Sequence, residues 1–377
     1  MVAPIDVLYV FTARKRRLLA GVAAGTDPDT LLFGLNQLRA DPNHGLPPWE
    51  APAPVAVDFH EPDLGRARRT VMTVIGRLGP DAVQLRTLPH FVGRDVVFLT
   101  GGWPLLFAAR LIPAARRPRI VWLNMTLTNL LRRGGPRASV LAAAARLADR
   151  IACVSADQQA FLVRRLGLGP ERLPVVLNGT DARFFRPELA TATAAPAPPG
   201  RYLLAAGRDA ARDYRTLSEA LAGSGHRTVI VCGKANLEGV NLPAGVEVRL
   251  DVPPAVLRDL YAGATAVVVP TCGDGDPVGS DCSGTLVSLD ALAMGRPVVV
   301  TARASVPEYL VPGVHATTVP AGDVRALRAA IDRSMATEEM TARAVADEAR
   351  AGQAHVRSGR TTDHFAAGIA NAFREVA

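Results

Sequence analysis

The sequence predicts an α/β protein with two domains, each a doubly wound parallel sheet covered by helices. Short apolar runs alternate with helical stretches along the chain, as expected of repeated βαβ units. The 377 residues are enough for two separate cores. Residues 188–200 are rich in Ala, Pro and Thr and lack an apolar period, which is typical of a linker. We therefore expect domains at 1–187 and 201–355, and a C-terminal helix at 356–377.

In the first half of the chain, several apolar runs have the length of buried strands. They are Ile5–Phe11, Val55–Asp58, Asp95–Thr100, Ile120–Asn124 and Ile151–Val154. Asp27-Pro28-Asp29-Thr30 supplies a cap and a proline for the start of a helix. The apolar stripe of this helix is Leu31, Leu35 and Leu38. The Ala-rich stretch Leu141–Asp149 predicts a further helix.

The second half repeats this alternation. The expected strands are Tyr202–Ala206, Thr228–Cys232, Val246–Leu250, Ala266–Pro270, Val298–Thr301 and Thr317–Val319. The expected helices are Pro254–Ala262, Thr285–Met294, one long helix from Gly322-Asp323 to about Arg350, and Thr361–Val376. Gly295 stands where a C-cap is needed and Pro297 follows, which ends the second of these helices at Met294.

The composition is that of an ordinary globular enzyme, with 49% hydrophobic and 21% charged residues. No apolar run reaches the roughly 18 residues of a membrane span, and the chain starts like a strand, so we expect a cytoplasmic protein. The net charge of +8 rests almost wholly on arginine, a bias typical of high-GC bacterial genomes. A basic balance favours anionic small molecules, an acidic membrane surface or nucleic acid. Nucleic acid is the weakest of these, because aromatic residues make up only 5%.

Two further features bear on partners and cofactors. The basic stretch from Arg14 to Arg17 is either a solvated loop or a contact to an anionic acceptor or a lipid surface. The four cysteines show no metal-type spacing.

The stretch Ala266–Tyr309 carries the first chemical signal. A polar loop between its first strand and its helix lies at the carboxyl end of that strand, where open α/β sheets bind ligands. Ser283, Gly284 and Thr285 offer backbone N–H groups at the helix start, and Gly284 leaves room for a phosphate. Asp290, about two turns further on, can accept from two ribose hydroxyls. Together they predict a nucleotide site; the alternative is a capped helix with a merely solvated Asp290.

The segment Asp290–Val299 resembles the donor-binding region of glycosyltransferase family 4. These are retaining enzymes with the GT-B fold, in which two Rossmann-like domains face each other across a cleft. The family has two glutamates at the spacing of Cys282 and Asp290. Asp290 stands in place of the second, which holds the ribose, and Cys282 in place of the first, which contacts the donor sugar. The resemblance therefore implies the ribose and phosphate roles and leaves the donor sugar open.

A second match to this family lies in Ala148–Pro187. The family pattern there is a strand ending in Ser, a helix, a short strand, and Asn-Gly-x-Asp with Phe and Pro close behind. The matching residues are Ser155, Asn178, Gly179, Asp181, Phe185 and Pro187.

Gly207-Arg208 occupies the place of a Gly-Arg pair that, with a nearby lysine, clasps the donor diphosphate in the family. Arg212 is the expected stand-in for the lysine, since arginine can grip phosphate oxygens with two donors. The resemblance thus implies that Arg208 and Arg212 are catalytic. The alternative is that both are surface arginines.

The resemblance implies an enzyme of the hexosyltransferase type that moves a sugar from a nucleotide-diphosphate sugar to an acceptor hydroxyl with retention of configuration. It also implies bacterial glycan, natural-product or glycoconjugate biosynthesis, with no metal and no cofactor besides the nucleotide-sugar co-substrate. Asp274-Gly275-Asp276 resembles the metal site of GT-A glycosyltransferases but is expected to be a loop of turn residues. The alternative functions are a nucleotide-sugar epimerase and a non-catalytic nucleotide-sugar-binding subunit.

The acceptor, which is a small molecule, a glycan or a lipid-linked molecule, is expected on the first domain. The candidate residues of its wall are Gly101, Gly102, Trp103, Asn124 and Thr126. GT-B enzymes often end with a helix that returns to the first domain, and the resemblance implies this for 356–377. A nucleic-acid partner is not expected, and a peripheral membrane contact is left open.

Overall fold

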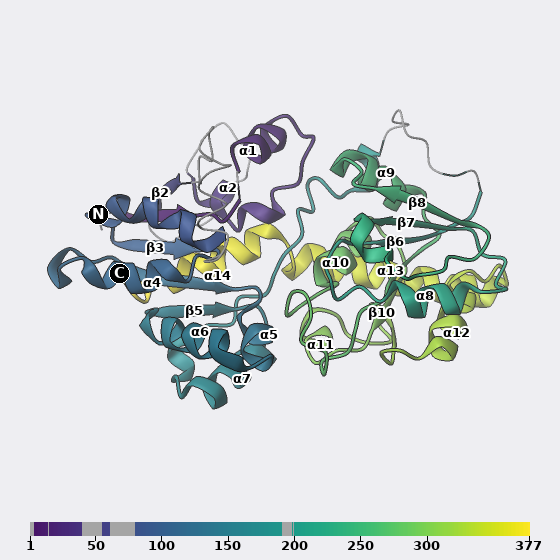
Figure 1. The fold of residues 1–377 in the computed structure, drawn as a ribbon. Helices are drawn as coiled ribbons and strands as arrows, with labels where there is room; N and C mark the ends of the chain where they lie inside the picture. Colours follow the sequence, from purple (N-terminus) through teal and green to yellow (C-terminus); the bar gives the residue numbers. More distant parts are fainter. Residues whose placement is uncertain (1–3, 14, 40–54, 61–79, 191–197, 199) are drawn as a thin grey trace. The chain divides into compact units, whose positions relative to one another are not determined.

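The structure, a computed structural model, describes residues 4–13, 15–39, 55–60, 80–190, 198 and 200–377. The chain divides into two compact units (Figure 1). The first unit comprises Met1–Ala23, Leu31–Leu177 and Asp363–Ala377, and the second comprises Ala24–Thr30 and Asn178–Thr362. Each unit has its own parallel sheet with helices on both faces, and the expected fold class is confirmed.

The sheet of the first unit has the strand order β2-β1-β3-β4-β5, and all neighbouring strands are parallel. Its strands are β1 (Ile5–Val10), β2 (Val55–His60), β3 (Val96–Leu99), β4 (Arg119–Asn124) and β5 (Arg150–Cys153). The helices described in this unit are α1 (Arg16–Ala23), α2 (Leu35–Leu38), α4 (Pro104–Ala108), α5 (Leu127–Arg132), α6 (Gly135–Leu147), α7 (Ala156–Leu166) and α14 (Thr362–Arg374).

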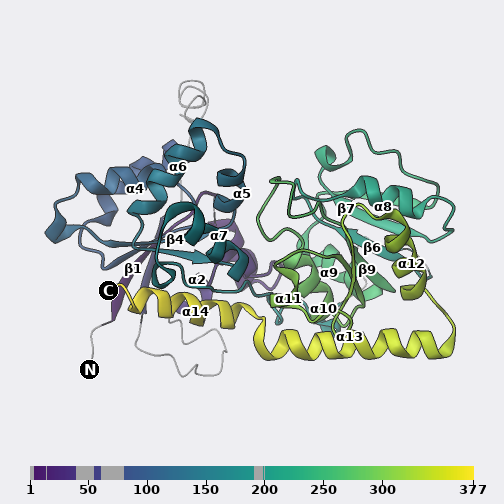
Figure 2. The same ribbon diagram turned by 90° about the horizontal axis from the view of Figure 1, so that it is seen from below.

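Successive strand residues point to opposite faces of this sheet, so each face has its own core. The face that packs with α4 to α7 carries Leu8, Val10, Val97, Leu99, Ile120, Trp122, Ile151 and Cys153. The other face carries Tyr9 and Phe98, whose rings lie 6.1 and 5.5 Å from the ring of Phe373 in α14. Figure 2 shows α4 and α6 on one side of the sheet and α14 on the other.

The helix expected after Asp27 forms only as a 3-10 turn, Thr30–Leu32, and the short α2. The two are separated by Phe33 and Gly34, which have φ values of +51° and +82°. Left-handed backbone cannot continue a right-handed helix. A Cβ on Gly34 would lie 3.1 Å from Ala366, so a glycine here also allows close packing against α14.

The sheet of the second unit has the strand order β11-β10-β9-β6-β7-β8 and is also parallel throughout. Its strands are β6 (Leu203–Ala206), β7 (Thr228–Cys232), β8 (Val246–Leu250), β9 (Ala266–Val269), β10 (Val298–Thr301) and β11 (Thr317–Val319). Its helices are α8 (Tyr214–Leu221), α9 (Pro254–Gly263), α10 (Thr285–Ala293), α11 (Val306–Tyr309), α12 (Val324–Ser334) and α13 (Glu339–Gly359).

The single long helix expected to reach Arg350 is wrong, because the chain forms α12 and α13 with a break at 335–338. Leu327 and Ile331 of α12 belong to the core shared with α8, whereas α13 packs against α10. Figure 2 shows α8 and α13 on opposite sides of the sheet. The chain must therefore leave the helical path to cover both faces. Among the described residues, no helix has the length and apolarity needed to cross a bilayer.

The division between the units falls at Leu177–Asn178, so residues 178–187 lie in the second unit rather than the first. Backbone hydrogen bonds explain this, since the Thr180 N–H donates to the Arg360 carbonyl at 2.9 Å. The Asn178 N–H donates to the Tyr309 hydroxyl, also at 2.9 Å. Residues 191–197 and 199 of the expected linker at 188–200 lie outside the described residues.

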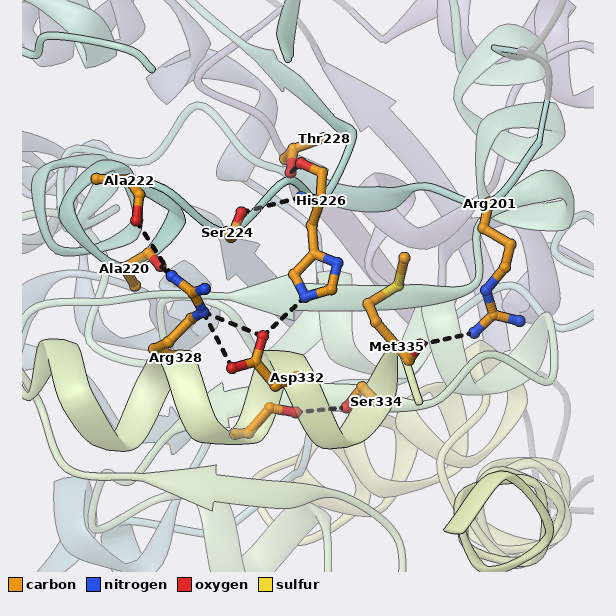
Figure 3. Close-up of polar contacts among 11 residues, drawn as sticks. Arg201, Ala220, Ala222, Ser224, His226, Thr228, Arg328, Asp332, Ser334 and Met335 are labelled. Carbon is orange, nitrogen blue, oxygen red and sulfur yellow. Dashed lines mark hydrogen bonds and ion pairs between the residues drawn. The ribbon is translucent and has the colours of Figure 1, made fainter. Parts of the chain in front are cut away.

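At the amino-terminal edge of the second sheet, His226 and Arg328 hold Asp332 between them (Figure 3). His226 Nε2 lies 2.7 Å from Asp332 Oδ1, and Arg328 Nε lies 3.0 Å from both carboxylate oxygens. The Arg328 guanidinium also donates to the carbonyls of Ala220 and Ala222 at the end of α8. The cluster ties α12 to α8 and to the start of β7, so we assign it a role in stability.

Candidate functional site

The candidate site of the second unit lies where its strand order reverses. β6 and β9 are neighbours at the centre of the sheet, and the chain turns to opposite sides after them. Ligands of open α/β sheets bind at the carboxyl ends of the strands at such a switch point. Here the segments that follow β6 and β9 meet, since Arg212 and Thr271 form an antiparallel bridge.

The guanidinium of Arg212 lies against the backbone of Gly207. A Cβ on Gly207 would lie 2.1 Å from Arg212 Nε, and Gly207 has a φ of +142°, so no other residue fits here. Arg212 is only 8% exposed. Its Nε and Nη1 nevertheless have no hydrogen-bond partner among the described residues. Burying a guanidinium whose N–H donors lack acceptors costs folding free energy, unless a bound anion supplies the acceptors and the opposite charge.

The start of α10 faces the same guanidinium. A Cβ on Gly284, which has a φ of +92°, would lie 3.2 Å from Arg212 Nη1 and 2.9 Å from Val269 Cγ1. The absence of a side chain therefore keeps open the space between the helix start and Arg212. Helix N-termini carry partial positive charge, so this space suits an anion.

The N–H donors at this helix start differ from those expected. The Ser283 and Thr285 N–H groups donate to the carbonyls of Ser280 and Cys282, both at 3.3 Å. Within the part of the chain that the structure describes, the N–H groups of Gly284, Leu286 and Val287 have no acceptor. The start of α10 therefore still has N–H groups without an acceptor, but they are not those of the predicted residues Ser283 and Thr285.

Arg303, which sequence reasoning missed, is a second buried guanidinium of this site. It follows β10, and its Nε donates to Asp274 Oδ1 at 3.0 Å while Nη2 donates to the Asp281 carbonyl at 2.9 Å. Its Nη1 is buried without a described partner. The signal that would have found it is its position just beyond the carboxyl end of a central strand.

The electrostatics of the two guanidinium groups favour a bound anion. Burial lowers the pKa of Arg212, and the positive charge of Arg303 lowers it further. Asp274 offsets part of the charge of Arg303, and the Ala304 N–H donates to the same carboxylate at 2.7 Å. Asp274 thus accepts a backbone hydrogen bond and forms an ion pair with Arg303, as a structural residue of the loop can.

Asp209 braces the loop that carries Arg212. Its carboxylate accepts from the N–H groups of Ala211 and Ser280, both at 2.9 Å. Burial alone would raise the pKa of Asp209, but these hydrogen bonds outweigh it and hold the pKa below its usual value. The carboxylate therefore stays ionised and keeps the segments after β6 and β9 together.

Asp290 lies in α10 but is not the merely solvated side chain of the alternative interpretation. The Thr180 hydroxyl donates to Asp290 Oδ1 at 2.5 Å, and the residue is half-buried. Burial raises the pKa of Asp290 to about 7, against the lowering effect of the Thr180 bond and with a further raising effect of Asp181. The carboxylate thus changes its ionisation near neutral pH.

Family models match most of the chain. Residues 47–184 match the model described as Glycosyltransferase Family 4, and residues 201–337 match the model described as Glycosyl transferases group 1. The chain belongs to the family 4 glycosyltransferases. No curated protein sequence matches it.

Solved structures agree on the GT-B fold of this glycosyltransferase. Sucrose-phosphate synthase from Thermosynechococcus elongatus has 16% identity and a TM-score of 0.67, with 98% of each chain covered. The OtsA apo structure has 13% identity and a TM-score of 0.66, with both chains fully covered. HepE from Anabaena in complex with UDP and glucose has 14% identity and a TM-score of 0.63, covering 98% of this chain and 99% of its own.

Arg208 is not brought into the guanidinium cluster of the glycosyltransferase. Its side chain is 71% exposed and pairs with Asp251 at 2.9 Å. It lies beside Gly233 at the end of β7, where a Cβ would come within 3.7 Å of its carbons. Of the two arginines assigned to the diphosphate, only Arg212 is therefore placed at the helix start.

In the first unit of the glycosyltransferase, Gly101 and Gly102 follow β3 at the point where the first sheet reverses its order. A Cβ on Gly101 would lie 2.4 Å from Thr12 Cγ2, and one on Gly102 would lie 1.8 Å from Gln84 Oε1. Gln84 is buried and donates to the Phe11 carbonyl, while its Oε1 has no partner among the described residues. Sequence reasoning missed this buried amide.

The other acceptor-side candidates have different surroundings. Asn124 is fully buried, and its amide bonds the Thr128 hydroxyl and the Leu127 N–H, both at 3.0 Å, so it caps α5 rather than lining a wall. Thr126 is exposed, and Trp103 packs its ring against Phe107 at 6.2 Å. The structure therefore groups only Gly101, Gly102 and the adjoining Trp103.

The basic stretch after β1 is not uniformly solvated. Lys15 is buried, with Nζ at 5.5 Å from the ring centre of Phe11 and 5.7 Å from that of Phe33. Burial lowers the pKa of Lys15. Arg16 and Arg17 are exposed, and Arg14 lies outside the described residues.

Substitution of Gly284 tests the space at the helix start. In Gly284→Ala the new methyl group enters the position beside Arg212 Nη1, so we expect at least a tenfold loss of affinity for a nucleoside diphosphate, measured by calorimetric titration. The left-handed backbone adds a destabilisation of about 1–2 kcal/mol. Gly313→Ala is the matched control, because Gly313 has a φ of +74° with nothing within 4 Å of a Cβ. Equal affinity of both variants would contradict the assignment.

Proposed function

We propose that this glycosyltransferase transfers a sugar from a nucleoside-diphosphate sugar to an acceptor hydroxyl with retention of anomeric configuration. The observation that carries the proposal is the buried guanidinium of Arg212 beside the start of α10, whose Nε and Nη1 have no hydrogen-bond acceptor among the described residues. A diphosphate supplies the negative charge that this arrangement lacks. Asp290, further along the same helix, is suited to the ribose.

The residues of the second unit take distinct roles. Arg212, Arg303 and the N–H groups at the start of α10 bind the diphosphate and stabilise its charge as the glycosidic bond breaks. These positive groups provide the stabilisation that a divalent cation provides elsewhere, so we propose that no metal is required. The leaving phosphate oxygen takes the proton of the acceptor hydroxyl on the same face of the sugar, which retains the configuration.

Acceptor recognition is assigned to the first unit. Gly101 and Gly102 let the side chains of Thr12 and Gln84 come close to the chain just after β3, and Gln84 Oε1, which is buried and has no described partner, is the acceptor that a ligand hydroxyl would use there. We propose this as the acceptor-binding edge, with Trp103 as an apolar wall. Its residues do not select one acceptor class.

A panel of nucleotide sugars tests the proposal, with UDP-glucose as its first member because the HepE structures contain UDP and UDP-glucose. The panel is incubated with sugar and lipid-linked acceptors, products are detected by mass, and the anomeric configuration is read by proton NMR. A product with inverted configuration would refute retention. Conversion of the donor without an acceptor would indicate an epimerase. Binding without turnover of any donor would indicate a binding subunit.

A further inference from the structure

The first unit contains an unusually basic stretch. Residues 96–148 include eight arginines and no lysine, aspartate or glutamate. The whole chain has a net charge of +8, so the excess positive charge is concentrated in this part of the sequence. Concentrated positive charge attracts anionic surfaces over a Debye length.

Within this stretch, three large apolar side chains are presented to solvent: Val140 in α6, and Phe107 and Leu111, which lie close together along the chain. Phe107 in α4 is 39% exposed, and Leu111 at the end of the adjoining 3-10 helix Ala109–Leu111 is 82% exposed. The two are four residues apart on continuous helical backbone, so they lie on one side. An isolated exposed apolar residue is ordinary, but here the pair lies among arginines.

Arg117 braces the backbone around Leu111. Its guanidinium donates to the carbonyls of Ala109, Arg110 and Ile112 at 2.8–3.2 Å. These hydrogen bonds therefore fix the backbone turn that exposes the side chain of Leu111.

Two open cavities of about 510 and 240 Å³ lie next to this turn. Both are lined by Arg117 and Arg119, with Arg116 in the first and Arg110 in the second. We call Phe107, Leu111 and these four arginines the basic-apolar surface.

Acidic residues neutralise only part of this surface. Asp149 pairs with Arg119 at 3.1 Å, and Asp95, which lines the first cavity, accepts from the Asp6 N–H at 2.9 Å. Among the described residues, Arg110, Arg116 and Arg117 have no acidic partner, and the Arg116 guanidinium has no side-chain partner at all. The exposed Arg110 and Arg116 therefore remain available to an external anion, whereas the Arg117 guanidinium is occupied by backbone carbonyls.

We propose that the basic-apolar surface docks the protein on an anionic lipid bilayer. Leu111 and Phe107 enter the headgroup region, and the arginines contact lipid phosphates around them. A bilayer fits better than nucleic acid, because an exposed leucine has no counterpart on a phosphate backbone, and single-stranded nucleic acid is bound through several stacked aromatic side chains, of which this surface has only Phe107. The proposal does not depend on the sugar donor.

Vesicle co-sedimentation of the full chain tests the proposal, with phosphatidylcholine vesicles that contain or lack phosphatidylglycerol. We expect binding only to the anionic vesicles and a decrease with rising salt. Arg116→Gln with Arg119→Gln should weaken binding about twenty-five-fold, since each arginine near such a surface contributes about fivefold. Leu111→Ser should weaken it about tenfold through lost apolar insertion.

Matched controls keep the test specific. Arg325→Gln with Arg343→Gln removes the same charge from exposed positions of the second unit, and Met340→Ser removes an apolar side chain that is 81% exposed. These controls should bind like the unmodified protein. Equal losses in the controls, binding to neutral vesicles, loss in Arg16→Gln with Arg17→Gln instead, or tighter binding to duplex DNA than to vesicles would each overturn the proposal.

Discussion

Replacement of Arg212 by methionine is expected to lower kcat/KM for the nucleotide sugar by a factor of about 10²–10³, or about 3–4 kcal/mol of transition-state stabilisation. The physical reason is that its uncovered Nε and Nη1 lie buried beside the start of α10, where a departing diphosphate gathers charge. Methionine fills similar volume without donors, so the change isolates the charge. Steady-state kinetics with the donor identified by the panel measure the effect.

Two controls separate catalysis from folding. In the ligand-free protein the buried Arg212 guanidinium lacks acceptors for two of its nitrogens, which destabilises the fold. Arg212→Met should therefore leave the thermal unfolding midpoint unchanged or raise it. Arg208→Met removes a 71% exposed arginine paired with Asp251 and should cost less than tenfold in kcat/KM. A lower melting temperature for Arg212→Met would show that Arg212 is structural. A larger kinetic loss for Arg208→Met than for Arg212→Met would show that the exposed Arg208 is the arginine that contacts the donor.

Substitution of Asp290 by asparagine is expected to remove the pH dependence of donor binding. With the pKa of Asp290 raised to about 7 by burial, affinity of the unmodified protein for the nucleotide sugar should rise between pH 6 and 8 as the carboxylate ionises. Asp290→Asn keeps the shape without the charge, so its affinity should be flat with pH. At pH 8 it should be weaker about ten- to a hundredfold, as charged hydrogen bonds contribute about 1.5–3 kcal/mol.

The same carboxylate makes a prediction for stability. Its folded-state pKa lies above the unfolded value of about 3.9, so the ligand-free fold binds the proton more tightly and loses stability as the pH rises from about 4 to about 7. Asp290→Asn should therefore gain more in melting temperature over the unmodified protein at pH 8 than at pH 5. Asp347→Asn, on the exposed side of α13, is the control and should show no such pH-dependent gain in melting temperature. For donor binding, a pH-dependent affinity that persists in Asp290→Asn would point to a histidine instead.

Much of the fold could be predicted because parallel strands buried on both faces are short, continuous apolar runs. Thr228–Cys232, Val246–Leu250, Val298–Thr301 and Thr317–Val319 were predicted to the residue. The helices were less certain, since the stop at Ser334 depends on which face of the sheet each helix must cover. A phenylalanine gives no indication that its backbone is left-handed, so the interruption at Phe33 could not be predicted. The shortness of α2, which follows this interruption, could not be predicted either.

The candidate site was easiest to predict where one segment supplies several of its parts, as Gly284 at the N-cap of α10 and Asp290 within α10 show. Residues brought in from other segments were missed. Arg303 follows β10 and Gln84 lies in the 3-10 helix Pro80–Phe91, and the sequence alone does not show that either lies beside a candidate site. Asn124 shows the converse. A polar residue at a strand end satisfied the pattern of a site, yet its amide is used within the core to cap α5.

The path of the polypeptide through its two units has a consequence for biosynthesis. The chain passes from the first unit to the second at residues 23–24, returns at 30–31, leaves again at 177–178 and returns at 362–363. α14 follows the other elements of both units, and its Phe373 covers Tyr9 and Phe98. On the ribosome, Tyr9 and Phe98 therefore lack the ring of Phe373 until α14 has been translated, by which time the strands and helices of the second unit have already been made. We therefore expect the first unit to complete its core after the second, and a nascent chain halted before α14 to expose aromatic side chains that chaperones can bind.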